Sequence, residues 1–279
     1  MKRMKHSMRP TPEDLLICAR NAVRVAGGHA LRHWATRRTE AIATFAHDIK
    51  LALDQECQTI AEHHIRRHYP NHAIMGEEDV GESGAAAEGT PYRWIIDPID
   101  GTLNYSHGLP LWCCSIAVQY KGRTVAGAVY APAMRELYSA TINGPALCNG
   151  RPLRVSRIRR LGAAMVATGL DKNVDPNLAP LDVFRAISGA TQRARILGSA
   201  ALDICHVAAG HLDGFFENGI YIWDIAAGQL IVERAGGRTA IMAEATGGRL
   251  RFLAANKPVF LSLQHLIEHT LKSARHAGR

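Results

Sequence analysis

The chain contains 279 residues, of which 47% are hydrophobic, and it carries a formal net charge of +8. This length allows one large domain or two closely packed halves with an extensive core. No apolar run approaches the roughly 18 residues of a membrane helix, and the basic residues form short clusters without interleaved aromatic side chains. We therefore expect neither a membrane nor a nucleic acid as partner, and a basic surface that helps to capture an anionic substrate.

The N-terminal segment is basic from Met1 to Arg9, but it continues as Thr-Pro-Glu-Asp and not as an apolar stretch. It therefore lacks the hydrophobic region of a secretory signal peptide. The six cysteines show no Cys-x-x-Cys spacing, which is typical of free thiols in a reducing compartment. We expect a cytoplasmic protein.

The first predicted helix starts with Thr11 as capping residue, followed by Pro12 and an acidic first turn. Apolar residues recur at helical spacing until Gly27-Gly28, where we expect this helix to end.

A second helix is predicted over residues 54–68, and Tyr69-Pro70 should end it. Its histidines at 63, 64 and 68 have the residue type of metal ligands. We interpret them as solvated positions on the helix surface.

The remaining chain mixes strands and helices. Strands are predicted over 92–96, 111–120, 124–130, 136–140, 165–168 and 214–217, and helices over 181–190, 199–209 and 224–235. Cys113 and Cys114 fall inside one apolar strand, where core packing is the expected role. The alternation predicts a layered α/β fold without internal repeats or linkers.

The most informative motif is Asp97-Pro-Ile-Asp100-Gly101-Thr102, directly after an apolar strand. Two carboxylates this close repel each other unless a cation lies between them. A Gly-Thr corner that opens a helix leaves backbone N–H groups free to face an anion. Taken alone, the motif is an ordinary turn. Glu77, which follows Gly76 upstream, and Asp224, at the start of a helix downstream, favour the metal and phosphate interpretation.

These three segments, in this order, resemble the inositol monophosphatase superfamily of Mg²⁺-dependent, lithium-sensitive phosphatases. The resemblance implies a five-layered α-β-α-β-α sandwich, a homodimer, and one phosphatase domain over residues 1–279. Within it, a half over residues 11–155 would carry most metal ligands. A half over residues 156–270 would carry Asp224 and the substrate pocket.

The resemblance also implies roles for individual residues. Glu77 and Asp97, with the carbonyl group of Ile99, would hold one Mg²⁺, and Asp97, Asp100 and Asp224 a second. Gly101 and Thr102 would bind phosphate through their N–H groups. The Thr102 hydroxyl, paired with Asp54, would orient or deprotonate the attacking water, with Glu77 also in a catalytic role. The substrate would contact Asp100, Ser199, Ala200, Glu217 and Asp224.

The residues themselves leave alternatives open at four of these positions. Asp224 and Ser199 could simply cap helices, Glu77 could be a solvated loop carboxylate, and Glu217 could lie on the surface at a strand end.

The sequence departs from the family at the segment Asp48-Ile-Lys50-Leu, which has lost a hydroxyl and gained a lysine. The lysine that often supports a third metal ion is missing from residues 39–47, so the resemblance leaves two or three ions open.

The leading hypothesis is a phosphomonoesterase acting on a small polyol or sugar phosphate such as myo-inositol 1-phosphate. The alternatives are histidinol phosphate, fructose 1,6-bisphosphate and 3′-phosphoadenosine nucleotides. A hypothesis of a different class is a non-catalytic binding or regulatory protein on the same fold.

Overall fold

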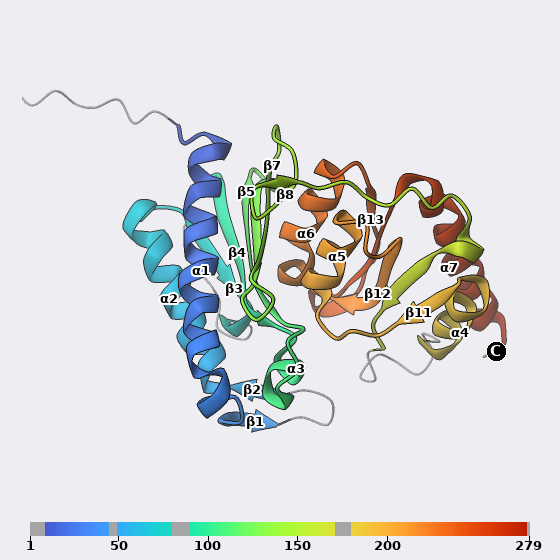
Figure 1. Cartoon of the computed structure of the whole chain (residues 1–279), viewed down its shortest axis with the longest axis horizontal. Helices are drawn as coiled ribbons and strands as arrows, with labels where there is room; N and C mark the ends of the chain where they lie inside the picture. The colour runs from blue at the N-terminus through green and yellow to red at the C-terminus, as the bar shows by residue number, and fades with distance from the viewer. Residues whose placement is uncertain (1–8, 45–48, 80–89, 171–179, 278–279) are drawn as a thin grey trace, which may run out of the picture.

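The computed structural model describes residues 9–44, 49–79, 90–170 and 180–277. Two helices, a seven-stranded sheet, two further helices, a five-stranded sheet and two last helices follow one another across the molecule (Figure 1). The predicted α-β-α-β-α sandwich is therefore confirmed.

The first helical layer consists of α1 (Pro12–Arg37) and α2 (Ala52–His68). Thr11 caps α1 as predicted, since its hydroxyl accepts the N–H of Asp14 at 3.1 Å. The prediction that α1 ends at Gly27 is wrong, because the helix continues for ten more residues to Arg37 (37 − 27). Gly27 serves close packing instead: a Cβ atom there would lie 3.0 Å from the ring of Tyr130 in the adjoining sheet.

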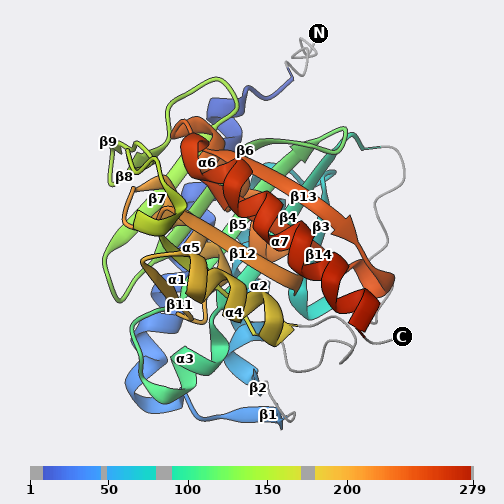
Figure 2. The same cartoon turned by 90° about the vertical axis from the view of Figure 1, so that its right-hand side faces the viewer.

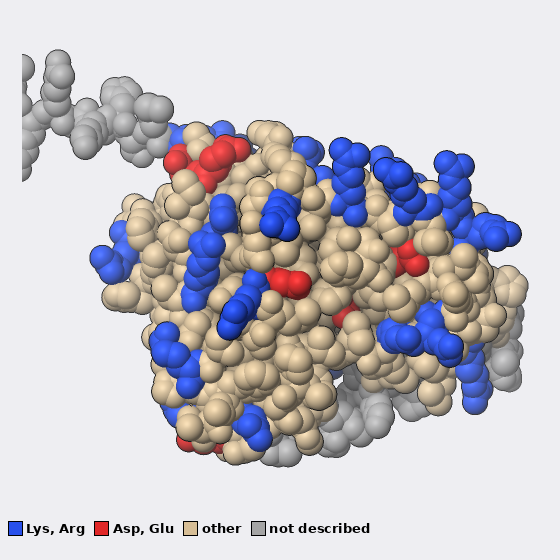
Figure 3. All heavy atoms as spheres, viewed as in Figure 1, with Lys and Arg blue, Asp and Glu red and all other residues tan. Residues whose placement is uncertain are grey.

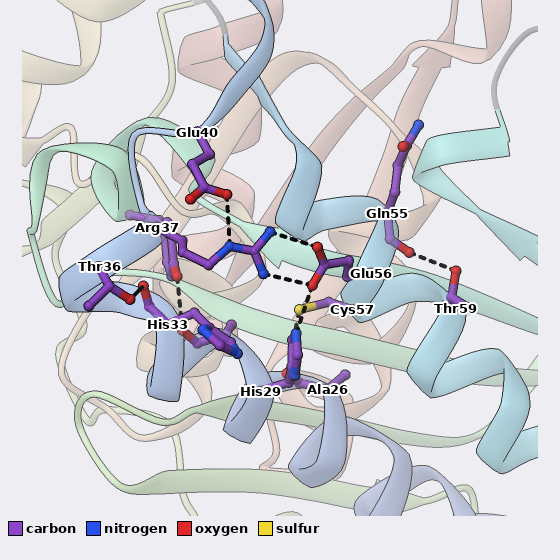
Figure 4. A network of polar contacts seen from close by, with 12 residues as sticks. Ala26, His29, His33, Thr36, Arg37, Glu40, Gln55, Glu56, Cys57 and Thr59 are labelled. Atoms are coloured by element: carbon purple, nitrogen blue, oxygen red, sulfur yellow. Dashed lines mark hydrogen bonds and ion pairs between the residues drawn. The ribbon is translucent and has the colours of Figure 1, made fainter.

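A polar network fixes α1 against the N-terminal half of α2 (Figure 4). The guanidinium of Arg37 binds both carboxylate oxygens of Glu56, at 2.7 and 3.0 Å, and the Arg37 Nε atom binds Glu40 at 2.7 Å. The His29 ring is a further partner of Glu56 at 3.0 Å. Arg37 lowers the pKa of Glu56 to about 2. The network therefore orients the α2 turn that carries Asp54.

The seven-stranded sheet has the order β3-β4-β5-β6-β7-β8-β9, and only β3 and β4 run parallel. Its strands are β3 (Ala73–Gly76), β4 (Tyr92–Asp100), β5 (Cys113–Tyr120), β6 (Arg123–Ala131), β7 (Glu136–Thr141), β8 (Leu147–Cys148) and β9 (Arg151–Pro152). The short helix α3 (Thr102–His107) follows β4, and β1 (Ala41–Thr44) pairs with β2 (Ile49–Leu51) just before α2.

The middle layer consists of α5 (Ala200–Ala208) and α6 (Ile222–Arg234), which lie between the two sheets. The five-stranded sheet has the order β11-β10-β12-β14-β13. Its strands are β10 (Met165–Thr168), β11 (Arg193–Arg195), β12 (Gly214–Ile220), β13 (Arg238–Glu244) and β14 (Leu250–Ala255). Figure 2 shows α7 (Lys257–Ala277) lying across the outer face of this sheet, with α4 (Pro180–Ala190) beside it.

Three hydrophobic clusters fill the spaces between the layers. One lies between α1, α2 and the first sheet, one surrounds α5 and α6 between the sheets, and one lies under α4 and α7. Cys113 and Cys114 are fully buried on opposite faces of β5, as their predicted packing role requires. Within the described ranges, no helix is long and apolar enough to cross a membrane. Lys and Arg side chains are distributed over both halves of the face shown in Figure 3.

Candidate active site

Two acidic side chains at the end of β4 face the same side of the sheet because the strand contains a bulge. Asp97 pairs with Ser115 of β5 and Asp100 pairs with Cys113, so three steps on β4 (100 − 97) match two on β5 (115 − 113). In a regular strand, side chains three positions apart point to opposite faces. The extra residue cancels this alternation, and both carboxylates face the space between the sheets.

Asp100 is held by the N-terminus of α5. Its carboxylate accepts the N–H groups of Ala200 and Ala201 at 3.1 and 2.8 Å and the hydroxyl of Ser199 at 2.5 Å. A carboxylate is favourable at the positive end of a helix. Burial raises the pKa of Asp100, and these hydrogen bonds oppose that rise. Ser199 occupies the N-cap position of α5, but its hydroxyl binds Asp100 and makes no hydrogen bond to the helix.

Asp97 carries a buried atom that lacks a partner. Its side chain is 1% exposed, and no residue of the described chain forms a hydrogen bond with its Oδ1 atom. Burial raises the pKa of Asp97, and the nearby charges of Glu77, Asp100 and Asp224 raise it further. Buried polar atoms are almost always satisfied, and a cation bound between the carboxylates would satisfy this atom and stabilise the acidic cluster.

Glu77 is placed beside Asp97 by a set of loop contacts. It opens a single 3₁₀ turn, Glu77–Asp79, directly after β3. The Gln58 side chain of α2 accepts the N–H of Glu78 at 3.0 Å and donates to Asp79 at 2.9 Å. A Cβ atom on Gly76 would lie 2.2 Å from the Gln58 amide, so glycine is required for this contact. Burial, followed by the charge of Asp224, raises the pKa of Glu77.

Asp224 comes to the same place from the second half of the chain. It occupies the third position of α6 and accepts the N–H of Tyr221 at 2.7 Å, so it caps the helix. One carboxylate oxygen each from Asp97, Asp100 and Asp224 lie within 4.8 Å of one another. Capping and metal binding are compatible, because the carboxylate has a second oxygen.

The Gly101-Thr102 corner starts α3 beside these acids. Gly101 has φ = 91°, and a Cβ atom there would lie 2.9 Å from the carbonyl oxygen of Leu111, so both conformation and space favour glycine. The Thr102 hydroxyl donates to the carbonyl oxygen of Ile99 at 2.9 Å. Its single proton is therefore not directed at Asp54, and the predicted pairing of Thr102 with Asp54 stays a prediction. Asp54 is 3% exposed and raises the pKa of Glu77 through its charge.

A cavity of about 360 Å³ opens between the two sheets over this cluster. Among the predicted site residues, all but Asp54 line it: Glu77, Asp97, Ile99, Asp100, Gly101, Thr102, Ser199, Ala200, Glu217 and Asp224. The Glu217 carboxylate lies against Gly169, where a Cβ atom would be 2.0 Å from its Oε1 atom. The alternative that Glu217 lies on the outer surface is therefore wrong.

Comparisons with known proteins agree with this geometry. The model of the inositol monophosphatase family matches residues 11–278. The chain belongs to the inositol monophosphatase family.

Relatives within the family carry two kinds of name. The chain is 39% identical over 231 residues to the Nus factor SuhB of Pseudomonas aeruginosa, covering 81% of this chain and 84% of the relative. It is 39% identical over 190 residues to the inositol-1-monophosphatase of Mesorhizobium japonicum, covering 66% and 68%. Among solved structures, an inositol monophosphatase of Thermotoga maritima superposes with a TM-score of 0.80 at 32% identity, covering 94% of this chain and 99% of that one.

The acidic cluster of this inositol monophosphatase family member suits a hard divalent cation. The donors from Glu77, Asp97, Asp100 and Asp224 are all carboxylates, which are the ligands that Mg²⁺ prefers. The Ile99 carbonyl oxygen accepts one hydrogen bond and keeps a second lone pair. Asp48 of the departing family segment lies outside the described residues, as does the side chain of Lys50, so the number of metal ions stays a prediction.

The sequence did not point to three further residues of the site. Asn104 lines the cavity and donates to the carbonyl oxygens of Leu111 and Leu197, at 2.8 and 2.7 Å, so it links the segment before β5 to the segment before α5. The thiol of Cys113 contacts Asp100 at 3.5 Å. Asp203 lines the cavity one helical turn after Ser199, is 3% exposed, and has a pKa raised by burial and by the charge of Asp100. None of the three belongs to one of the segments that resemble the family, so their part in the site depends on the tertiary structure.

Proposed function

We propose that this family member is a Mg²⁺-dependent phosphomonoesterase acting on a small polyol or sugar phosphate, with myo-inositol 1-phosphate as the leading candidate. The observation that carries the proposal is the buried, unpartnered Oδ1 atom of Asp97 within a cluster of carboxylates that lines a cavity. The mutual repulsion of clustered carboxylates destabilises the protein unless a cation neutralises it.

The proposed roles follow from the chemistry of each group. Bound Mg²⁺ ions, two or three per site, would neutralise the phosphoryl charge and supply an activated water. Glu77, Asp97, Asp100 and Asp224, with the Ile99 carbonyl group, would hold these ions.

Other residues would act on the substrate and on water directly. The N–H groups of Gly101 and Thr102 would bind the phosphate at the start of α3. Asp54 and the Thr102 hydroxyl would orient the attacking water and receive its proton. That role requires the hydroxyl to exchange its contact with Ile99 for one with Asp54.

Discrimination between substrates would come from groups that contact the alcohol portion, because every monoester shares the phosphate. Glu217 and Asp203 line the cavity from β12 and α5 and give it two carboxyl groups for substrate hydroxyls, with Ser199 and Ala200 in the same wall. Such groups would be left unsatisfied by an apolar substrate. They favour a polyol phosphate over the alternatives of histidinol phosphate and adenosine nucleotides, whose alcohol portions present fewer hydroxyls.

We also propose that the protein forms a homodimer and that it is cytoplasmic. All six cysteines carry free thiols, and five of them are buried, as expected for a reducing compartment. A binding or regulatory role is the second candidate, and the relatives named Nus factor SuhB favour it.

A phosphate-release assay separates these candidates. Purified protein should hydrolyse myo-inositol 1-phosphate in Mg²⁺ and lose this activity in excess chelator. A panel of the alternative phosphates should give lower kcat/KM values. The absence of hydrolysis of every phosphate in saturating Mg²⁺ would contradict the enzymatic proposal and leave the regulatory one.

The variant Glu217→Gln tests the substrate assignment. Loss of hydrogen bonds to a charged acceptor should weaken a polyol phosphate by about 1.5–3 kcal/mol in kcat/KM, while a flat aryl phosphate should lose almost nothing. Equal losses on both substrates would instead assign Glu217 to support of the metal site.

A further inference from the structure

A second group of potential metal ligands lies outside the cavity, between the two helices of the first layer. It consists of Cys18 on α1 and of His64 and His68, one turn apart on α2. One ligand atom from each residue lies within 4.8 Å of the other two. His64 follows Asp54 by ten residues (64 − 54), or about 15 Å along the helix axis. The group is therefore separate from the carboxylate cluster.

Both imidazole rings are arranged to offer a lone pair. The Nδ1 atom of His68 contacts the carbonyl oxygen of His64 at 2.9 Å. Because a carbonyl group can only accept, Nδ1 carries the proton and Nε2 is left with the lone pair, as is usual for metal-binding histidines. The Nε2 atom of His64 is buried and has no hydrogen-bond partner in the described chain. Burial lowers the pKa of His64, which favours its neutral form.

The third donor is a thiol with little exposure. Cys18 is 4% exposed, and burial raises its pKa to about 12. Without a bound metal ion, Cys18 is therefore a neutral thiol. A thiophilic cation would displace its proton to solvent and form an S–metal bond, so that binding releases one proton for each ion.

We propose that Cys18, His64 and His68 form a binding site for Zn²⁺ or a similarly thiophilic divalent cation. A sulfur and two imidazole nitrogens select such ions over Mg²⁺, which requires oxygen ligands. Bonds of about 2.0–2.3 Å in tetrahedral geometry separate the ligands by roughly 3.3–3.8 Å. Small side-chain rotations bring donors within 4.8 Å to that spacing. His68 is exposed, so water can complete the coordination shell.

A metal ion bound at this site would link α1 to α2. The protein would then have two metal sites with different preferences. Oxygen donors in the cavity take the hard cation, and sulfur and nitrogen donors between the helices take the softer one. The interpretation of the three α2 histidines as solvated positions holds for His63, which is exposed. It does not hold for His64, whose Nε2 atom is buried.

Cobalt binding to the full-length protein tests the proposal. Co²⁺ is titrated into metal-free, reduced protein in the presence of saturating Mg²⁺, which occupies the carboxylate cluster. We expect one equivalent to bind with a thiolate-to-cobalt charge-transfer band in the near ultraviolet, and Zn²⁺ to displace it. Cys18→Ser should abolish the band, and His64→Ala should weaken Co²⁺ binding by about 100-fold, because a three-ligand site loses a ligand.

Two matched variants serve as controls. His63→Ala removes the neighbouring, exposed imidazole, and Cys57→Ser changes a buried thiol of α2 that is not part of the proposed site. Both should bind Co²⁺ like the unaltered protein. Thermal unfolding of each variant without metal verifies the fold, and His64→Ala retains the test if Cys18→Ser does not fold. A missing charge-transfer band in the unaltered protein, or an equal loss in the His63 and His64 variants, would overturn the proposal.

Discussion

Replacing Asp97 by asparagine should stabilise the metal-free protein while it weakens Mg²⁺ binding. The substitution keeps the size of the side chain and removes its charge from the centre of the cluster. Two ionised carboxylates whose oxygens lie within 4.8 Å of each other repel each other by at least about 3.5 kcal/mol at an effective dielectric constant of about 20. Proton uptake relieves part of this repulsion, as the raised pKa values of Asp97 and Glu77 indicate. We therefore expect the free energy of unfolding in chelator to rise by about 1–3 kcal/mol.

Saturating Mg²⁺ should remove the higher free energy of unfolding that Asp97→Asn shows in chelator. A ligand at 100 times its Kd stabilises the native state by about 2.7 kcal/mol, and the unaltered protein should gain at least that. The Asp97→Asn variant binds Mg²⁺ more weakly and should gain less, so the two unfolding curves should approach each other or change order. Urea unfolding at pH 7, in chelator and in saturating Mg²⁺, measures all four free energies.

Asp213→Asn is the matched control, since Asp213 is also a buried aspartate, at 7% exposure. Its carboxylate accepts the N–H of Met165 at 2.6 Å and the hydroxyl of Ser156, so it has partners within the fold. Asp213→Asn should therefore lower the free energy of unfolding by about 1–3 kcal/mol, with or without Mg²⁺. If Asp97→Asn loses as much stability in chelator as the control does, Asp97 is structural and the argument for the metal site fails.

Three further predictions follow from the structure. In chelator, the free energy of unfolding should fall as pH rises above about 4, because Glu77, Asp97 and Asp100 have raised pKa values in the fold and keep protons that the unfolded chain has lost. Urea unfolding across pH should show a shallower fall in Asp97→Asn, and an equal slope in both proteins would contradict this. Gly101→Ala should lower the free energy of unfolding by about 1–3 kcal/mol because of its positive φ and the close carbonyl group of Leu111; an unchanged urea midpoint would refute the strain. Light scattering at micromolar concentration should give about twice the 30.4 kDa of one chain, whereas a mass near 30.4 kDa would exclude the dimer.

The sequence determined the type of fold and the chemical character of the site. Helical and strand periodicity located five of the helices and six of the strands, including β10 over residues 165–168 without error, because each element must bury an apolar face. No prediction covered β13, β14 or α7, which follow residue 235. The acids at 77, 97, 100 and 224 were recognisable because three short segments resemble one family in the same order. Local signals of this kind depend only on neighbouring residues, so the sequence by itself displays them.

Only the tertiary structure decided how far α1 extends and how the site residues contact one another. Gly27 looked like a helix end, yet its lack of a side chain serves packing against Tyr130. Asp100 is bound by the start of α5, about a hundred positions away in the chain, through contacts with Ala200 and Ala201. Asp203 enters the cavity only because α5 lies between the two sheets. These features depend on which surfaces pack against each other in the fold. Such contacts join residues that are far apart in the chain, so no local pattern in a single sequence indicates them.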